Sequence, residues 1–321
     1  MAELDDGRRQ MSDALLRAPR RPHRMMSLWL TLQATLPEAP HWHRGATSPV
    51  VGVASTSGTD GERLVVLLRE PQQVDLERLR RGMDIPFPVD SLVTGPIRAA
   101  ARPAQGGDSL SGDAQGGDTG TLGCLVHTAT GDALVLGCNH TLAAINRALV
   151  GSDTVRQPGA GDGGTNPMDT LGMLMDFEPL RLGGYHPNHI DAAVAAPSNA
   201  ADVVAGIRGI GTIAGVGGPL TYGARVQKVG WQTARTIGTC RQVTNLVLEV
   251  GGVDEALFHD QYGIEGDNPS GFAQGGDSGA AVLTYPGNEL VGIVIGVTGL
   301  RLAIVCPIRP VLDAFKVTVA R

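Results

Sequence analysis

The sequence predicts a mainly β protein built from many short strands and tight turns. Its 321 residues, enough for one large or two medium domains, include 45 glycines and 20 prolines, too many for a helical bundle. Short apolar runs separated by glycines recur along the chain, with the spacing of a sandwich or a pair of closed barrels. Aromatic residues make up only 4% of the chain, so the core must consist mostly of Val, Leu, Ile and Ala.

Composition and charge exclude several classes of protein. The formal net charge is −6 with no basic patch, so nucleic acid is not an expected partner. No stretch approaches the roughly 18–20 apolar residues of a membrane span, and the apolar run at 25–32 is too short for a signal peptide. Only two residues are lysines, Lys228 and Lys316, and the other cations are arginines. We attribute this imbalance to codon usage.

The cysteines are too few and too scattered for a disulfide framework. Cys124 and Cys138 would face each other across a hairpin, but reduced core thiols are the expectation for all four, which include Cys240 and Cys306. Because no signal peptide is expected, the cytoplasm is the expected compartment.

The first third of the chain divides into three segments. Residues 1–48 are rich in Arg and Pro and are expected to be a partly disordered or helical extension, with an amphipathic helix around 11–35. Its His41-x-His43 pair has no acid or cysteine nearby, so no metal site is expected there. Residues 49–102 are predicted to form a small β-rich unit, with strands at 50–54, 64–68 and 89–97 and a helix at 76–83.

Residues 103–120 are predicted to be a solvated, flexible loop because they are rich in Gly and Asp. The loop contains two near-copies of a motif that returns at residue 273. In one copy Ser109 lacks the following glycine, and in the other Thr119 stands in place of serine.

From residue 121 to 321 the pattern is all-β and fits either a sandwich or a pair of closed barrels. Strands at 122–127 and 133–137 flank a turn at 130–132, and a short helical turn can follow at Asn139. Further strands are expected around 170–176, 189–195, 203–207, 224–230, 235–239, 245–250, 280–284 and 290–297. The segment 310–315 predicts a short C-terminal helix with one apolar face.

The main chemical candidate is Ser278 in Gly275-Gly276-Asp277-Ser278-Gly279-Ala280. The glycines permit a sharp turn, and that turn would aim the N–H groups of Gly276 and Ser278 at one point, as an oxyanion hole requires. An ordinary hairpin loop explains the same composition. The choice between the two depends on whether a base and an orienting acid precede the serine.

A base and an acid are both present. His140 follows an apolar strand beside small residues, and His127 and His259 are the alternative bases. Asp191 opens a small apolar strand, where a buried carboxylate is costly without a partner such as imidazole. The competing interpretation of His186-x-x-His189-x-Asp191 is a metal site, but no third strong ligand is evident. The order His140, Asp191, Ser278 is one of the known triad orders and places the serine in the second barrel.

These residues and their contexts resemble the chymotrypsin-fold (trypsin-like) serine proteases of the PA clan. The segments Cys138-Asn139-His140, Asn188 to Ala193 and Val229 to Thr233 look closest to the bacterial intracellular group related to the plant Narrow Leaf protease. Two departures are Trp231, where that group usually has arginine, and Ala280-Ala281, where secreted trypsins have Gly-Pro. Neither departure removes a catalytic group.

The resemblance implies a fold, an activity and a specificity site. It implies two antiparallel β-barrels of the chymotrypsin type behind a small N-terminal β-rich unit, with a short C-terminal helix. It also implies an oxyanion hole at Gly276 and Ser278 and a specificity pocket at Phe272, Ile295 and Val297, which would prefer apolar or small residues.

The sequence therefore predicts a serine endopeptidase acting on protein or peptide substrates, with His140, Asp191 and Ser278 as catalytic residues. No cofactor and no metal are expected, and a homo-oligomer is left open. The alternative is a protease-fold binding or scaffold module that is inactive or cleaves only itself.

Overall fold

The structure is a computed structural model that describes residues 50–58, 61–68, 76–82, 88–93, 102–114, 118–250, 254–299 and 301–321. The expected extension at 1–48, with its helix and its two histidines, lies outside the described residues. The chain divides into two compact units, Met1–Ala100 and Ala101–Arg321. No described helix has the length and apolar character that crossing a membrane would require.

The first unit is a small sheet with one helix. Strand β1 (Val50–Gly58) pairs antiparallel with β2 (Gly61–Leu68), and β3 (Val89–Val93) pairs parallel with β2 after helix α3 (Leu76–Gly82). Alternate residues of β2 are buried, as expected for a strand with one covered face. The three strands and the helix predicted for this unit are all present, with shifted ends.

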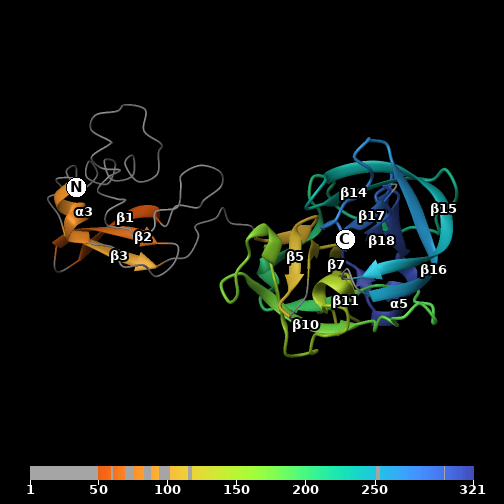
Figure 1. The fold of residues 1–321 in the computed structure, drawn as a ribbon, viewed down its shortest axis with the longest axis horizontal. Coiled ribbons are helices and arrows are strands. Elements are labelled where there is room, and N and C mark those ends of the chain that lie inside the picture. The colour runs from red at the N-terminus through yellow and green to blue at the C-terminus, as the bar shows by residue number, and fades with distance from the viewer. Residues whose placement is uncertain are drawn as a thin grey trace. The chain divides into compact units, whose positions relative to one another are not determined.

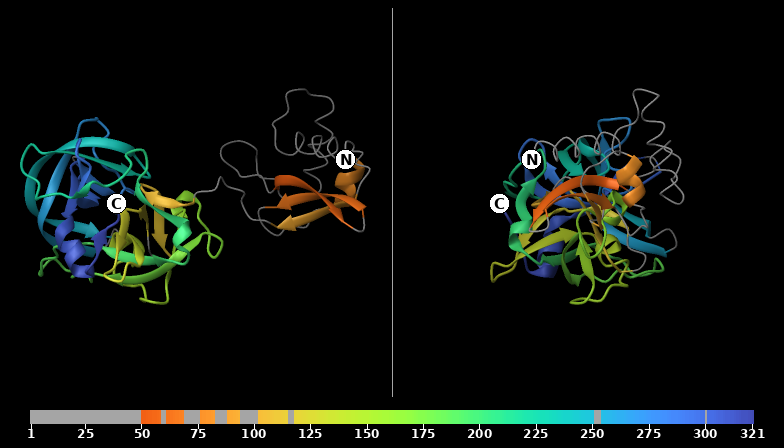
Figure 2. Two further views of the ribbon diagram at one scale, coloured as in Figure 1. Left: turned by 180° about the vertical axis from the view of Figure 1, so that it is seen from behind. Right: turned by 90° about the vertical axis from the view of Figure 1, so that its left-hand side faces the viewer.

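The second unit contains two curled antiparallel sheets, which lie side by side in both Figure 1 and Figure 2. The first sheet has the strand order β20-β7-β8-β11-β10-β9-β5-β6. Its strands are β5 (Ser109–Gly112), β6 (Thr119–Thr121), β7 (Cys124–His127), β8 (Ala133–Gly137), β9 (Thr154–Arg156), β10 (Thr170–Phe177), β11 (Ala193–Pro197) and β20 (Thr318–Val319). A separate parallel pair joins β4 (Ala104–Gly106) to β12 (Val203–Ile207).

The described residues of the segment 103–120 correct the sequence prediction, because they do not form a solvated loop. Strands β4 and β5 and the first two residues of β6 lie within the segment, and all four residues of β5 are buried. Its polar side chains find partners inside the fold: Asp108 accepts from the Gln105 N–H at 2.9 Å, and Ser109 donates to Asp162 at 2.6 Å. The first barrel therefore begins before residue 121.

The second sheet closes on itself. Its order is β13-β18-β17-β14-β15-β16-β19, and an additional pairing joins β18 to β19. The strands are β13 (Gly215–Val216), β14 (Arg225–Gly230), β15 (Ala234–Val250), β16 (Asp254–Gly266), β17 (Ala281–Thr284), β18 (Glu289–Val297) and β19 (Ala303–Pro307). The two strands predicted at 235–239 and 245–250 are one strand, β15, interrupted by two register shifts.

Short helices complete the unit. They are α4 (Asn139–Leu142), η1 (Ala160–Asp162), η2 (Ala200–Asp202) and the C-terminal α5 (Ile308–Phe315). Buried residues of both sheets and α5 form one apolar cluster, which joins Leu136 and Ala192 of the first barrel to Ile293 and Cys306 of the second. This shared core fixes the two barrels against each other.

Candidate active site

Strand pairing brings His140 and Asp191 to the same end of the first sheet. Gly137, the last residue of β8, lies opposite Ala193, the first residue of β11, and the strands are antiparallel. The chain leaving β8 and the chain entering β11 therefore emerge at the same edge. His140 lies three residues beyond β8, and Asp191 lies two residues before β11.

The Asp191 carboxylate makes two hydrogen bonds to His140. The His140 Nδ1 atom and Asp191 Oδ2 are 2.5 Å apart, and the backbone N–H of His140 donates to Oδ1 at 3.2 Å. The Asp191 side chain is fully buried, whereas the His140 side chain keeps 12% of its surface exposed. Burial lowers the pKa of His140, but the charge and the hydrogen bond of Asp191, with a smaller contribution from Asp118, raise it above its ordinary value.

Two asparagines anchor the helix that carries His140. The Asn139 amide donates to the Glu178 carbonyl at 2.7 Å and to Asn146 Oδ1 at 2.8 Å. Asn146 in turn accepts from the Leu180 N–H and donates to its carbonyl, both at 2.8 Å. Both asparagines thus tie α4 to the segment that leads to Asp191. Neither asparagine was predicted to have this anchoring role.

Ser278 is the second residue of the later of two consecutive tight turns, which share Asp277 and lie just before β17. The Asp277 N–H donates to the Gln274 carbonyl, and the Ala280 N–H donates to the Asp277 carbonyl, each at 3.0 Å. The third residues of these turns are Gly276 and Gly279, with φ of +100° and +95°. Positive φ at this position is typical of a type II turn and strongly favours glycine, as the sequence suggested.

The carbonyl groups of this turn are held by one residue of the first barrel. Thr121 donates its hydroxyl to the Gly276 carbonyl at 3.0 Å and its N–H to the Ser278 carbonyl at 2.7 Å. Within the described part of the chain, the N–H groups of Gly276 and Ser278 have no hydrogen-bond partner. Two free donors beside a serine hydroxyl are what an oxyanion hole requires.

The Ser278 turn packs against the end of β8, close to His140. A Cβ atom built on Gly120 would lie 2.6 Å from the Ser278 carbonyl oxygen and 2.7 Å from Thr141 Cγ2, so both residues crowd this glycine. A Cβ on Gly279 would lie 3.5 Å from the Cys138 backbone nitrogen. Among the described residues the Ser278 hydroxyl has no hydrogen-bond partner. Hydrogen bonds between a nucleophile and its base are often long or poorly aligned in a free enzyme and tighten only when substrate is bound.

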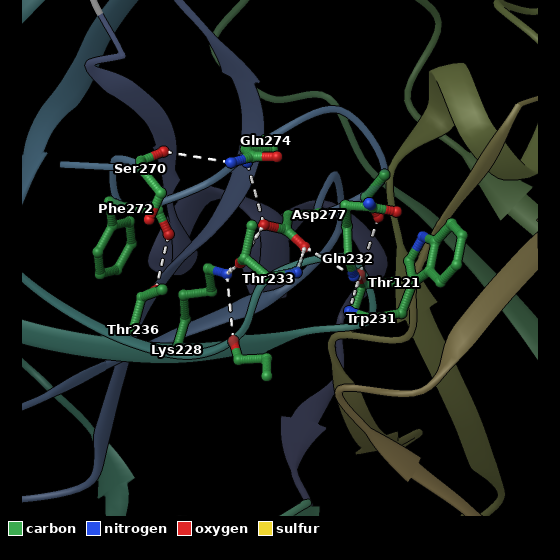
Figure 3. Close-up of polar contacts among 12 residues, drawn as sticks. Thr121, Lys228, Trp231, Gln232, Thr233, Thr236, Ser270, Phe272, Gln274 and Asp277 are labelled. Atoms are coloured by element: carbon green, nitrogen blue, oxygen red, sulfur yellow. Dashed lines mark hydrogen bonds and ion pairs between the residues drawn. The ribbon is translucent and has the colours of Figure 1, made fainter. Parts of the chain in front are cut away.

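A buried ion pair, shown in Figure 3, fixes the loop in front of Ser278. Lys228 Nζ and Asp277 Oδ2 are 2.9 Å apart, and both side chains are fully buried. Asp277 also accepts from the backbone N–H groups of Gln232, Thr233 and Gln274 at 3.1–3.2 Å and from the Thr233 hydroxyl at 2.6 Å. Burial lowers the pKa of Lys228, although the charge of Asp277 opposes this shift.

The ion pair was missed at the sequence level, although a weak signal was present. Lys228 is one of only two lysines and lies within a predicted strand, β14. Its carboxylate partner lies 49 residues away along the chain, so no local pattern predicts the contact. The pair ties the connection between β14 and β15 to the turn that holds Ser278.

The alternative metal site at His186, His189 and Asp191 does not assemble within the described residues. Asp191 faces His140, whereas His189 Nδ1 lies 3.6 Å from Asp260 and its ring packs edge-on against His259. The ligand-type side chains that do meet, with ligand atoms within 4.8 Å of one another, are Cys138, His140 and Asp191. The alternative base His127 lies at the end of β7.

The three residues predicted for the specificity pocket differ in exposure. Phe272 is fully buried in the core of the second barrel, with its ring centroid 5.9 Å from Lys228 Nζ. Ile295 is 2% exposed, and Val297, at the end of β18, is 36% exposed. Only Val297 offers much surface to an approaching molecule.

Replacing Gly276 with alanine tests the turn. We expect a loss of roughly 1–3 kcal/mol of unfolding free energy, since alanine disfavours φ of +100°. Its Cβ would also lie 2.8 Å from Trp231 Nε1. Any hydrolytic activity should fall by roughly 10²-fold or more, because the N–H groups predicted to be oxyanion donors would move.

Gly275→Ala is the matched control, because a Cβ there has no atom within 4 Å. Denaturant unfolding and kcat are measured for both variants. Equal changes in unfolding free energy and in kcat for the two variants would contradict this description of the turn.

The chain resembles known proteins in its three-dimensional structure. No protein-family model matches the chain, and neither does any curated protein. Among solved structures, chymotrypsin from Cellulomonas bogoriensis is 18% identical over 67% of this chain and 97% of its own, with a TM-score of 0.46. A Nocardiopsis protease is 17% identical over 68% and 98%, with a TM-score of 0.47.

A third structure, Thermobifida fusca protease A, is 18% identical over 67% of this chain and 97% of its own, with a TM-score of 0.46. At sequence identities this low, the comparison shows a similar fold and does not assign the chain to a subgroup. The chain is similar in structure to bacterial serine proteases of the chymotrypsin fold: it is mainly β, with two curled antiparallel sheets like the chymotrypsin barrels and a short C-terminal helix.

Proposed function

We propose that the chain is a serine-type endopeptidase that hydrolyses peptide bonds through an acyl-enzyme intermediate. The observation that carries the proposal is the 2.5 Å contact between His140 and the buried Asp191, at the barrel edge against which the Ser278 turn packs. A serine hydroxyl is a weak nucleophile unless an oriented base removes its proton. We also propose, on the motifs quoted above, that the chain belongs to the group related to the plant Narrow Leaf protease.

Each residue has one role in this mechanism. His140 takes the Ser278 proton as the hydroxyl attacks the scissile carbonyl, and it later gives the proton to the leaving amine. Asp191 accepts from Nδ1, which keeps Nε2 free to act as the base and stabilises the imidazolium. The N–H groups of Gly276 and Ser278 bind the oxyanion, and loss of one such donor typically costs about 3–4 kcal/mol of barrier.

The free edge of β18 is the proposed binding place for the substrate backbone. Strand β17 pairs with β18 up to Ile293, and the Gly279 N–H donates to the Val294 carbonyl at 2.7 Å. Beyond this point β18 runs on to Val297 with β19 on one side only, among the described residues. An extended peptide paired with this edge would pass Ser278.

The side chains around this edge are apolar, which supports a preference for apolar or small residues at the cleavage site. A Cβ on Gly296 would lie 2.7 Å from Leu248 Cδ1, so β15 covers this part of β18. Phe272 and Ile295 lie behind it in the core, and the Lys228 ammonium near Phe272 is already paired with Asp277.

Digestion of an unstructured peptide library tests the proposed function. We expect cleavage mainly after apolar or small residues, with the cut sites identified by mass spectrometry. A profile dominated by Arg or Lys would refute the specificity. Folded protein that cleaves nothing would favour the binding-module alternative.

A further inference from the structure

A third side chain with metal-binding chemistry lies beside the His140–Asp191 pair. The Cys138 sulfur, one ring nitrogen of His140 and one carboxylate oxygen of Asp191 all lie within 4.8 Å of one another. Cys138 is fully buried just before α4, and its thiol donates to the Val294 carbonyl at 3.2 Å. The proposed mechanism gives this thiol no role.

These three atoms form the donor set of a thiophilic metal. Thiolate, imidazole and carboxylate together suit Zn²⁺ and its heavier relative Cd²⁺, whereas Mg²⁺ and Ca²⁺ prefer oxygen ligands alone. The charges also balance, because one thiolate and one carboxylate neutralise a divalent ion. A neutral assembly is the form that a buried site tolerates best.

The surroundings of the thiol favour a cation. The carboxylate of Asp191 is fully buried and lies within 4.8 Å of the Cys138 sulfur, so its negative charge attracts a cation to this place. An ion can approach past His140, whose side chain is 12% exposed.

We propose that Cys138, His140 and Asp191 bind one thiophilic divalent ion, which switches the catalytic site off. The Cys138 S–H bond breaks, its proton passes to solvent, and sulfur binds the metal. The metal also binds His140 Nδ1 and an Asp191 oxygen, and the ring proton moves from Nδ1 to Nε2. With its proton on Nε2, His140 cannot accept the proton of Ser278.

Metal binding itself is independent of the proposed peptidase function, whereas the inhibition rests on it. Cd²⁺ is a suitable probe, because cadmium–thiolate bonds absorb in the ultraviolet and the ion is not redox-active. The full-length protein is titrated in a phosphine reductant, which keeps the four thiols reduced without supplying a competing thiol. The matched control for Cys138→Ala is Cys124→Ala, a second fully buried free cysteine of the same barrel.

We expect wild type and Cys124→Ala each to bind one Cd²⁺ ion and to show charge-transfer absorption. Addition of Mg²⁺ should produce no such absorption. Cys138→Ala should bind more than about 100-fold more weakly, since loss of a ligand costs more than loss of an outer-shell partner. No absorption in wild type, or the same absorption in Cys138→Ala, would overturn the site.

A serine-reactive phosphonate measures inhibition in the same samples. Cd²⁺ should block labelling of wild type but not of Cys138→Ala, with each variant compared with itself without metal. Cadmium absorption together with undiminished labelling would refute the inhibition while leaving the metal site intact. Absorption without any labelling in metal-free protein would refute the peptidase function instead.

Discussion

Replacing Asp191 with asparagine is expected to lower kcat by about 10⁴-fold, with a much smaller effect on KM. The carboxylate accepts from His140 Nδ1 at 2.5 Å and so selects the tautomer whose Nε2 atom is free. An asparagine amide can donate to Nδ1 instead, which leaves the proton on Nε2 and removes the base. Steady-state kinetics on a peptide cleaved by wild type measure the change.

Asp260→Asn is the matched control for this variant. Asp260 also lies beside a histidine, 3.6 Å from His189 Nδ1, but its side chain is 74% exposed. We expect this substitution to leave kcat and stability almost unchanged, as for most exposed positions. An equal loss of kcat in both variants would mean that Asp191 has no special role in orienting a base.

Replacing Lys228 with methionine is expected to cost about 3–5 kcal/mol of unfolding free energy. The substitution leaves Asp277 charged, buried and without its cation, since both side chains are fully buried in the native protein. The Gln274–Asp277 turn should loosen as a result, and the proposed oxyanion donors should lose their fixed positions. Denaturant unfolding measures the stability, and probe labelling of Ser278 measures the state of the turn.

Two further variants separate charge from packing. The double variant Lys228→Met with Asp277→Asn removes both charges and should recover much of the lost stability. Lys316→Met alters the other lysine, which is exposed at the end of α5, and should change stability by less than about 0.5 kcal/mol. A double variant as unstable as Lys228→Met would show that the ion pair is not what stabilises this loop.

The fold was predictable from the sequence where apolar runs were short and bounded by glycines. Strands β8, β17 and β18 fell close to their predicted places for this reason. Strand β16 was not predicted, because polar residues such as His259 and Asp260 interrupt its apolar pattern at a change of register with β15. Pairing with a neighbour, which no local pattern records, makes this segment a strand.

The candidate site was predictable to the extent that it depends on order along the chain. His140 and Asp191 could be paired because one follows an apolar strand and the other precedes one. The segment at 103–120 was misjudged, and the role of Lys228 was missed, for the opposite reason. Their polar groups have partners far along the chain, such as Asp162 and Asp277, which no local pattern records.

The most direct test of the account is to identify the residue that a serine-reactive phosphonate modifies. Wild type, Ser278→Ala and Ser109→Ala are labelled in parallel, and the modified peptide is sequenced by mass spectrometry. Ser109 is the matched control, because it lies in a near-copy of the motif but is 3% exposed and donates to Asp162 at 2.6 Å. We predict an adduct on Ser278 in wild type and in Ser109→Ala and none in Ser278→Ala. Equal labelling of Ser278→Ala, or no labelling of folded wild type, would contradict the account.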